Sequence, residues 1–302
     1  MVEAVELAPD LAVLRASIAN VYFAGTRDSW VLIDTGVPGW GPKIRAAAEK
    51  RFGETKPKAI LLTHGHFDHA ACAMELAKFW EVPVYAHRME FPYLTGQSAY
   101  PQKDPTVGGA MAFLSRFFPS RTVNIGTVLK ELPESHEIPG LAGWRWIEAP
   151  GHAPGQVCFW QEAGRIIVAG DALATVDLDS WRKLIAWKQE IAKPPSPFNY
   201  NWELARQSVL TIAALKPRIL ACGHGDPVAG ENVAAQLEAF AGKFEPPKHG
   251  RYSTEPAHTN ENGVFYEPPA PKDNLPKIAA GAAAGVFVVA GLLYNRRRKK
   301  PE

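Results

Sequence analysis

Short apolar runs alternate with segments of helical periodicity along most of this chain. The first apolar runs, at residues 11–18, 19–23 and 30–33, are rich in apolar and β-branched side chains and predict strands ahead of any helix. Further strands are expected at 59–62, 82–86, 144–148, 156–160, 165–169 and 218–221, and helices at 42–52, 70–80, 180–192, 202–215 and 232–244. This order predicts a mixed α/β (α+β) fold in which sheets are covered by helices.

Residues 89–125 interrupt this alternation. They carry six phenylalanine and tyrosine side chains among prolines and glycines. We expect an inserted loop with a short helix at about 110–118. The aromatic side chains either pack into a local core of the loop or line a substrate site, and the sequence favours neither reading.

The composition changes after residue 245, which ends a first domain of residues 1–245. Residues 246–277 are rich in proline and polar side chains and predict a linker. Residues 278–294 then carry no charge, and a helix of this length spans roughly 26 Å at about 1.5 Å per residue. Because five basic side chains follow within the tail 295–302, we expect a membrane-anchoring helix; a buried Ala/Gly-rich helix is the alternative.

The charge balance limits the partners that the protein can have. The chain has 33 basic and 31 acidic side chains; without residues 295–302 these become 28 and 30, so the body is slightly acidic. This argues against a nucleic-acid partner. Three cysteines do not make a disulfide framework, and the acidic N-terminus is unlike a signal peptide. We therefore expect a membrane-associated protein whose main domain lies on the cytoplasmic side.

The most informative stretch is His64-Gly65-His66-Phe67-Asp68-His69, at the end of an expected strand. Imidazole and carboxylate groups are the usual ligands of zinc, iron and manganese. Side chains alternate along a strand, so His64 and His66 can point the same way. The turn that follows can direct Asp68 and His69 toward a second ion.

Three more candidate ligands stand at strand ends or turns: His152, Asp171 and His224. Each is a weak signal alone, since a histidine at a turn is more often a cap or a surface residue. Together they occupy the place where open α/β sheets bind ligands, and their neighbouring glycines permit close approach of the backbone.

The order THGHFDH, GH, GD and GHG resembles the metallo-β-lactamase superfamily over about residues 10–245, and most of all its glyoxalase II-like hydrolases. The resemblance implies a four-layer αββα sandwich with metal ions between the sheet edges, here followed by the hydrophobic tail helix. It implies two divalent ions, most simply Zn²⁺, with iron or manganese as alternatives. The implied first site is His64, His66 and His152; the second is Asp68, His69 and His224; Asp171 bridges them, and Asp34 supports a ligating histidine.

The resemblance also implies metal-assisted hydrolysis of an ester-like carbonyl such as a thioester or lactone. A hydroxide shared by two metals would attack, and Asp68 would guide a proton to the leaving group. The aromatic insertion and the tryptophans at 181 and 187 suggest an apolar small-molecule substrate.

Two alternatives remain. The first is a mononuclear non-haem iron oxidoreductase similar to persulfide dioxygenases, and the second is a metal-stabilised domain without activity that recruits partners. Because all seven ligand positions are filled, we favour the dinuclear hydrolase.

Overall fold

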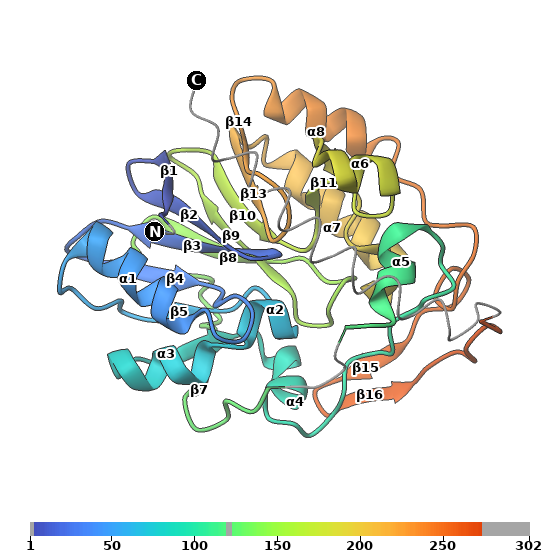
Figure 1. Ribbon diagram of the computed structural model, residues 1–302, viewed down its shortest axis with the longest axis horizontal. Helices are drawn as coiled ribbons and strands as arrows, with labels where there is room; N and C mark the ends of the chain where they lie inside the picture. The colour runs from blue at the N-terminus through green and yellow to red at the C-terminus, as the bar shows by residue number, and fades with distance from the viewer. Residues whose placement is uncertain (1–2, 119–122, 274–302) are drawn as a thin grey trace.

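Two β-sheets form the centre of the protein in the computed structural model, which describes residues 3–118 and 123–273 (Figure 1). The larger sheet runs in sequence order from β1 to β7, antiparallel as far as β4 and parallel beyond it. Its strands are β1 (Val5–Ala8), β2 (Leu11–Ala16), β3 (Ala19–Gly25), β4 (Trp30–Ile33), β5 (Ile60–Leu61), β6 (Val84–Ala86) and β7 (Leu129–Glu131).

The smaller sheet has the order β14-β13-β10-β9-β8. Only β10 and β13 pair in parallel, which brings the carboxyl ends of these two strands to the same edge. Its strands are β8 (Trp144–Glu148), β9 (Val157–Gln161), β10 (Ile166–Gly170), β13 (Ile219–Cys222) and β14 (Val228–Ala229). Two short ladders complete the β-structure: β11 (Ala174–Val176) with β12 (Gln189–Ala192), and β15 (His258–Asn260) with β16 (Gly263–Tyr266).

Strand β2 shows how the alternation of side chains builds two cores. Leu11 and Val13 pack into the core that the two sheets share, whereas Ala12 and Leu14 pack into a second core on the helix-covered side. Both faces of the strand are buried, so its sequence is a continuous apolar run instead of an alternating one.

Helices cover the outer face of each sheet. The helix α1 (Gly41–Phe52) and the helix α3 (Ala73–Trp80) contribute to the core outside the larger sheet, where the Trp30 ring stacks on Phe52 at 4.3 Å between centroids. The helices α7 (Trp202–Ala214) and α8 (Val233–Ala241) pack outside the smaller sheet. The remaining helical segments are α2 (Phe67–Ala70), η1 (Arg88–Glu90), α4 (Phe91–Leu94), α5 (Gly109–Ser115), α6 (Trp181–Ala186) and η2 (Ser196–Phe198). The predicted mixed α/β fold is confirmed.

The helix expected over 180–192 is wrong in its second half. Ser180 caps the start of α6, where its hydroxyl accepts a hydrogen bond from the Lys183 N–H. The helix ends at Ala186, Trp187 after it adopts a left-handed conformation with φ of 49°, and the chain then continues as strand β12. Pairing with β11 outweighs the helical periodicity of the sequence in this segment.

The inserted region contains the predicted short helix, α5, although it is shorter than expected. Met111 and Leu114 of α5 pack with Val176 and Leu178 in a small separate core. The local-core reading of the insertion therefore holds for α5.

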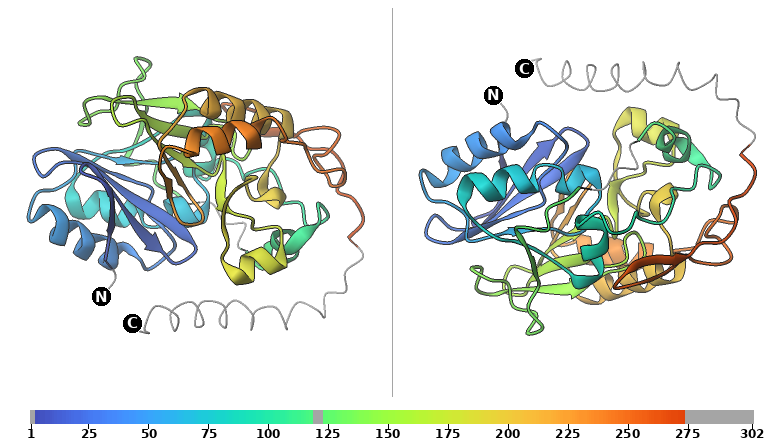
Figure 2. Two further views of the ribbon diagram at one scale, coloured as in Figure 1. Left: turned by 90° about the horizontal axis from the view of Figure 1, so that it is seen from above. Right: turned by 90° about the horizontal axis from the view of Figure 1, so that it is seen from below.

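Residues 246–273, expected as a linker, carry the β15–β16 hairpin, which lies at the end of the molecule away from α1 (Figure 2). Tyr252 and Ala257 are buried in the core under α7 and α8. The Val264 N–H donates to the Ser98 hydroxyl at 3.2 Å, which joins the hairpin to the inserted region. The predicted anchor at 278–294 and the basic tail lie outside the described residues. Among the residues that the structure does describe, no helix is long and apolar enough to cross a membrane.

Candidate metal centre

The segment of residues 64–69 leaves strand β5 and turns into the short helix α2 (Figure 1). His64 and His69 are fully buried, while His66 is partly exposed. A Cβ atom on Gly65 would lie 2.6 Å from the Tyr100 hydroxyl, so only glycine fits between the two histidines. This glycine lets the chain pass close to Tyr100, and the ring centroids of His64 and His66 on either side of it lie 4.7 Å apart.

The other three candidate ligands follow strands of the smaller sheet. His152 lies shortly after β8, Asp171 directly follows β10, and His224 lies just beyond β13. Asn20 of β3 donates to the carbonyl groups of Cys222 and Gly225 at 2.9 and 2.7 Å, which fixes the loop that carries His224 against the larger sheet. The seven predicted ligand positions therefore meet where the edges of the two sheets approach each other.

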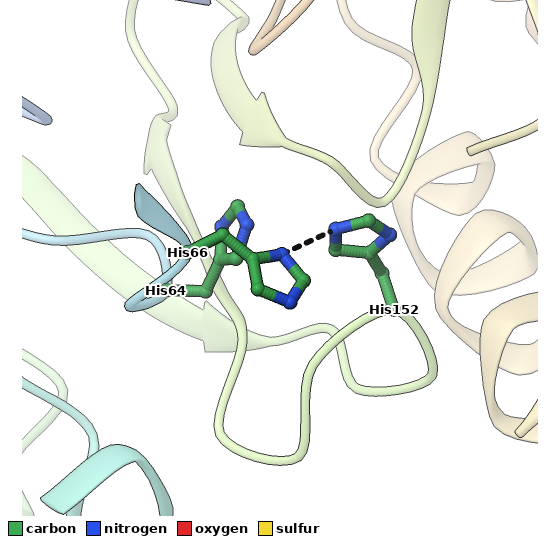
Figure 3. Close-up of side chains that lie close together, drawn as sticks. All are labelled: His64, His66 and His152. Atoms are coloured by element: carbon green, nitrogen blue, oxygen red, sulfur yellow. Dashed lines mark hydrogen bonds between the residues drawn. The ribbon is translucent and has the colours of Figure 1, made fainter. Parts of the chain in front are cut away.

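The structure brings these side chains into three overlapping groups, within each of which the potential ligand atoms lie no more than 4.8 Å apart. The groups are His64, His66 and His152; His64, His69 and Asp171; and Asp68, His69 and His224. In the first group, His66 Nδ1 lies 3.0 Å from His152 Nε2 (Figure 3).

Asp171 lies between the predicted first and second sites. Its Oδ2 atom is 3.5 Å from His152 Nε2 and 3.0 Å from His224 Nε2. Its Oδ1 atom is 3.5 Å from His69 Nε2. Asp68 completes the second group with Oδ2 at 3.6 Å from His224 Nε2.

Three buried atoms of this cluster have no hydrogen-bond partner within the described part of the chain: His64 Nε2, His69 Nε2 and Asp171 Oδ1. Buried polar atoms are rarely left without a partner, because their desolvation costs about 1–3 kcal/mol each. These three atoms face one another and belong to one group of potential ligands. A divalent cation would satisfy all three, so the residues present fit a metal site.

The outer nitrogen of each buried imidazole is held by the surrounding protein. Asp34 Oδ2 lies 2.8 Å from His69 Nδ1, while the same carboxylate accepts hydrogen bonds from the N–H and hydroxyl of Thr63, each at 2.8 Å. His224 Nδ1 lies 2.8 Å from the carbonyl oxygen of Ile18. Such contacts fix the tautomer and leave Nε2 as the ligand atom. They give Asp34 the supporting position that the sequence predicts.

Further supporting contacts come from residues that the sequence analysis did not select. Asn199 Oδ1 lies 3.3 Å from His152 Nδ1, and Thr63 Oγ1 lies 3.1 Å from His64 Nδ1. Asn199 belongs to a loop far along the chain from His152, and no local motif marks it.

Glu90 is the most prominent residue that the sequence analysis missed. Its fully buried carboxylate accepts hydrogen bonds from the N–H of Gly65 at 2.8 Å and from the N–H of Gly155 at 2.7 Å. The Tyr100 hydroxyl also donates to it. Burial raises the pKa of Glu90 to about 7, against the opposing effect of these three donors. Glu90 thus ties the segment of His64 and His66 to the segment of His152.

The histidines of the site differ in the direction in which their pKa values are shifted. Burial lowers the pKa of His66 to about 4, and it lowers the pKa values of His64 and His152 well below the ordinary range. These imidazoles are therefore neutral near pH 7, as metal binding requires. Burial acts in the same direction on His224, but the charge of Asp171 outweighs it and the pKa of His224 rises to about 9.

The three cysteines behave as small buried apolar residues. All are reduced and buried, and no candidate ligand group found among the described residues includes one. Burial raises the pKa of the Cys222 thiol, so it stays protonated beside the site.

A family model described as the metallo-beta-lactamase superfamily matches residues 14–224, which include all seven candidate ligands and Asp34. The chain belongs to the metallo-beta-lactamase superfamily. Among curated proteins, it is 41% identical over 236 residues to the probable metallo-hydrolase YflN of Bacillus subtilis, covering 76% of this chain and 89% of that protein. The superfamily predicted from the sequence is thereby confirmed.

Two further similarities are more distant. Hydroxyacylglutathione hydrolase GloC of Haemophilus influenzae is 28% identical over 118 residues, which are 38% of this chain and 50% of that protein. Among solved structures, the BLEG-1 B3 metallo-beta-lactamase has a TM-score of 0.52 at 23% identity, with 78% of this chain and 98% of that chain covered. The structural similarity shows a shared fold.

Proposed function

We propose that this superfamily member is a metallo-hydrolase that binds two divalent metal ions and cleaves an ester-like carbonyl compound, such as a thioester or a lactone. The convergence of three orphaned buried ligand atoms, His64 Nε2, His69 Nε2 and Asp171 Oδ1, carries this proposal. The name of YflN and the distant similarity to GloC, a thioester hydrolase by its name, support it.

His64, His66 and His152 would hold one ion, and Asp68, His69 and His224 the other, with Asp171 between them. Metal ions bound there would supply a nucleophile from water near neutral pH and polarise the substrate carbonyl. We take Zn²⁺ as the physiological ion, because imidazole and carboxylate ligands suit it.

Groups of the protein itself orient the imidazole ligands and transfer a proton to the leaving group. Asp34 and the Ile18 carbonyl keep the imidazoles of His69 and His224 turned toward the centre. Asp68 keeps 12% of its side chain exposed, unlike the fully buried His69, so its carboxylate is accessible to a substrate. We assign to Asp68 the transfer of a proton to the leaving group.

Elemental analysis of the purified full-length protein tests this proposal, with the Asp68→Ala variant beside it. We expect about two zinc ions per chain, fewer in the variant, and a parallel loss of thioester or lactone hydrolysis. One iron ion per chain, unaffected by Asp68→Ala, would exclude the dinuclear mechanism and favour the iron oxidoreductase. Metal binding without turnover of any ester would favour the non-catalytic alternative.

We also propose that residues 278–294 attach the protein to a membrane, with the catalytic part on the cytoplasmic side. The uncharged run of 17 residues supports the attachment. The catalytic part stays on the cytoplasmic side either if the basic end of the tail crosses the membrane late, or if the segment lies in the cytoplasmic leaflet with the basic residues on anionic headgroups. Protease added outside intact cells should leave the catalytic part undigested; digestion from outside would reverse the orientation.

A further inference from the structure

Three phenylalanine side chains form a continuous surface that begins at the candidate metal centre. The ring centroid of Phe198 lies 5.9 Å from that of His66 and 6.2 Å from that of His152. The Phe118 ring follows at 6.0 Å from Phe198, and the Phe67 ring at 6.1 Å from Phe118. We call these three rings the aromatic wall. It extends directly from two of the candidate ligands.

The fold holds the first ring of the wall in place. Phe198 ends the proline-flanked turn η2, and its N–H donates to the carbonyl oxygen of Pro195 at 3.2 Å. The side-chain amide of Asn199 donates to the same carbonyl oxygen at 3.2 Å, while its Oδ1 atom lies 3.3 Å from His152 Nδ1. The backbone of Phe198 is therefore fixed relative to His152, and little of it has to be ordered when a ligand binds.

The wall is only partly covered by protein. Phe67, Phe118 and Phe198 are each partly exposed, whereas Leu114 and Val176 of the small core behind them are no more than 2% exposed. Apolar surface gains roughly 25 cal/mol per Å² when it leaves water, so an apolar group that covers these rings is stabilised. A carboxylate in the same place would lose hydration, and the neighbouring ammonium of Lys103 already donates to the carbonyl oxygen of Phe118.

We propose that the aromatic wall binds an uncharged, apolar acyl group of the substrate while the carbonyl lies at the His66 and His152 end. This proposal rests on the proposed hydrolase function and narrows it to esters or thioesters of aliphatic or aryl acids. Acyl groups that carry a carboxylate are disfavoured. The wall joins residues of α2, of η2 and of the segment after α5, so the inserted region contributes directly to specificity.

A matched pair of thioesters tests the proposal: hexanoyl and adipoyl thioesters of N-acetylcysteamine, which differ by a terminal carboxylate, with the acetyl thioester as a short reference. We expect the wild-type kcat/KM for the hexanoyl compound to exceed that for the adipoyl compound at least tenfold. Phe118→Ala should lower kcat/KM for the hexanoyl thioester about tenfold and lower the acetyl value much less, because an acetyl group covers less of the wall. Phe118 is the decisive position because its ring joins those of Phe67 and Phe198 in the wall, whereas the Phe198 ring lies beside two candidate ligands.

Phe79→Ala is the matched control, because Phe79 is 56% exposed on α3, which packs outside the larger sheet. It should leave all three rates unchanged. Equal rates for hexanoyl and adipoyl thioesters would refute acyl binding by the aromatic wall, and so would an unchanged preference for the hexanoyl compound in Phe118→Ala. Neither result would contradict the hydrolase function.

If no thioester or lactone is cleaved, the hydrolase function fails. Calorimetry with the uncharged ketone 2-octanone then tests apolar binding at the aromatic wall independently of hydrolysis. Binding that weakens in Phe118→Ala supports the wall, whereas absence of binding overturns it.

Discussion

The carboxylate of Asp34 lies 2.8 Å from His69 Nδ1, on the side of the imidazole that faces away from the metal centre. An ionised carboxylate only accepts hydrogen bonds, so it holds a proton on Nδ1 and leaves Nε2, which faces Asp171, as the atom that a metal ion would bind. Asp34 thereby selects the tautomer of His69 that binds a metal.

Asp34→Asn should therefore weaken metal binding about 10- to 100-fold. Asp34 has a left-handed backbone with φ of 60°, which asparagine also adopts readily, so the substitution changes the acceptor and spares the backbone. If the amide oxygen keeps the hydrogen bond from the Thr63 N–H, the amide NH₂ faces His69 Nδ1 and favours the wrong tautomer. Competition with a chelator measures the dissociation constant.

The exposed Asp28, which precedes β4 whereas Asp34 follows it, supplies the control for this substitution, since Asp28→Asn removes a charge without touching a histidine. Its metal affinity should equal that of the wild type. Equal affinities of Asp34→Asn and wild type would show that His69 does not bind the metal through Nε2.

The sequence predicted those parts of the site that depend on local order. His64, His66, Asp68 and His69 lie within six residues after one apolar run, and the strand ends before Asp171 and His224 are also visible as apolar runs. Buried parallel strands leave this signal because both of their faces are apolar.

Apart from Asp34, the residues that support the ligands left no comparable signal. Glu90 and Asn199 reach the site through contacts between segments that lie 25 to 65 residues apart in sequence. From the sequence alone, an acidic residue such as Glu90 is expected at the surface. Its three hydrogen-bond donors are brought together only by the fold. The same limit applies to strand β12, whose pairing with β11 overrides a helical pattern.

At Gly223, the addition of a single methyl group should reduce metal binding at the site. A Cβ atom there would lie 2.0 Å from Asp171 Oδ1 and 2.7 Å from His69 Cε1. Gly223→Ala must therefore displace the carboxylate that lies between the two metal positions. We expect the metal content to fall from about two ions per chain to one or none.

Gly242→Ala is the matched substitution, because a Cβ atom at the end of α8 meets nothing closer than 3.5 Å. It should retain the metal and the thermal stability of the wild type. Full metal occupancy in Gly223→Ala would mean that Asp171 is not a ligand.

The buried carboxyl of Glu90 predicts a pH dependence of stability in the metal-free protein. Its pKa is raised by burial to about 7, from an ordinary value of 4.5. Between these two values the folded state binds more protons than the unfolded state, so the free energy of unfolding falls as the pH rises. The full contribution of Glu90 across this interval is on the order of 3 kcal/mol.

Glu90→Gln cannot titrate, so urea unfolding at several pH values between 4.5 and 7 should show its stability falling less steeply with pH than that of the wild type. The histidines titrate in the same interval, but they do so in both proteins and cancel in the difference. Glu54→Gln, at an exposed position, should retain the wild-type slope. Parallel curves for Glu90→Gln and wild type would mean that Glu90 is ionised throughout the interval. The hydrogen bonds from Gly65, Gly155 and Tyr100 would then outweigh burial.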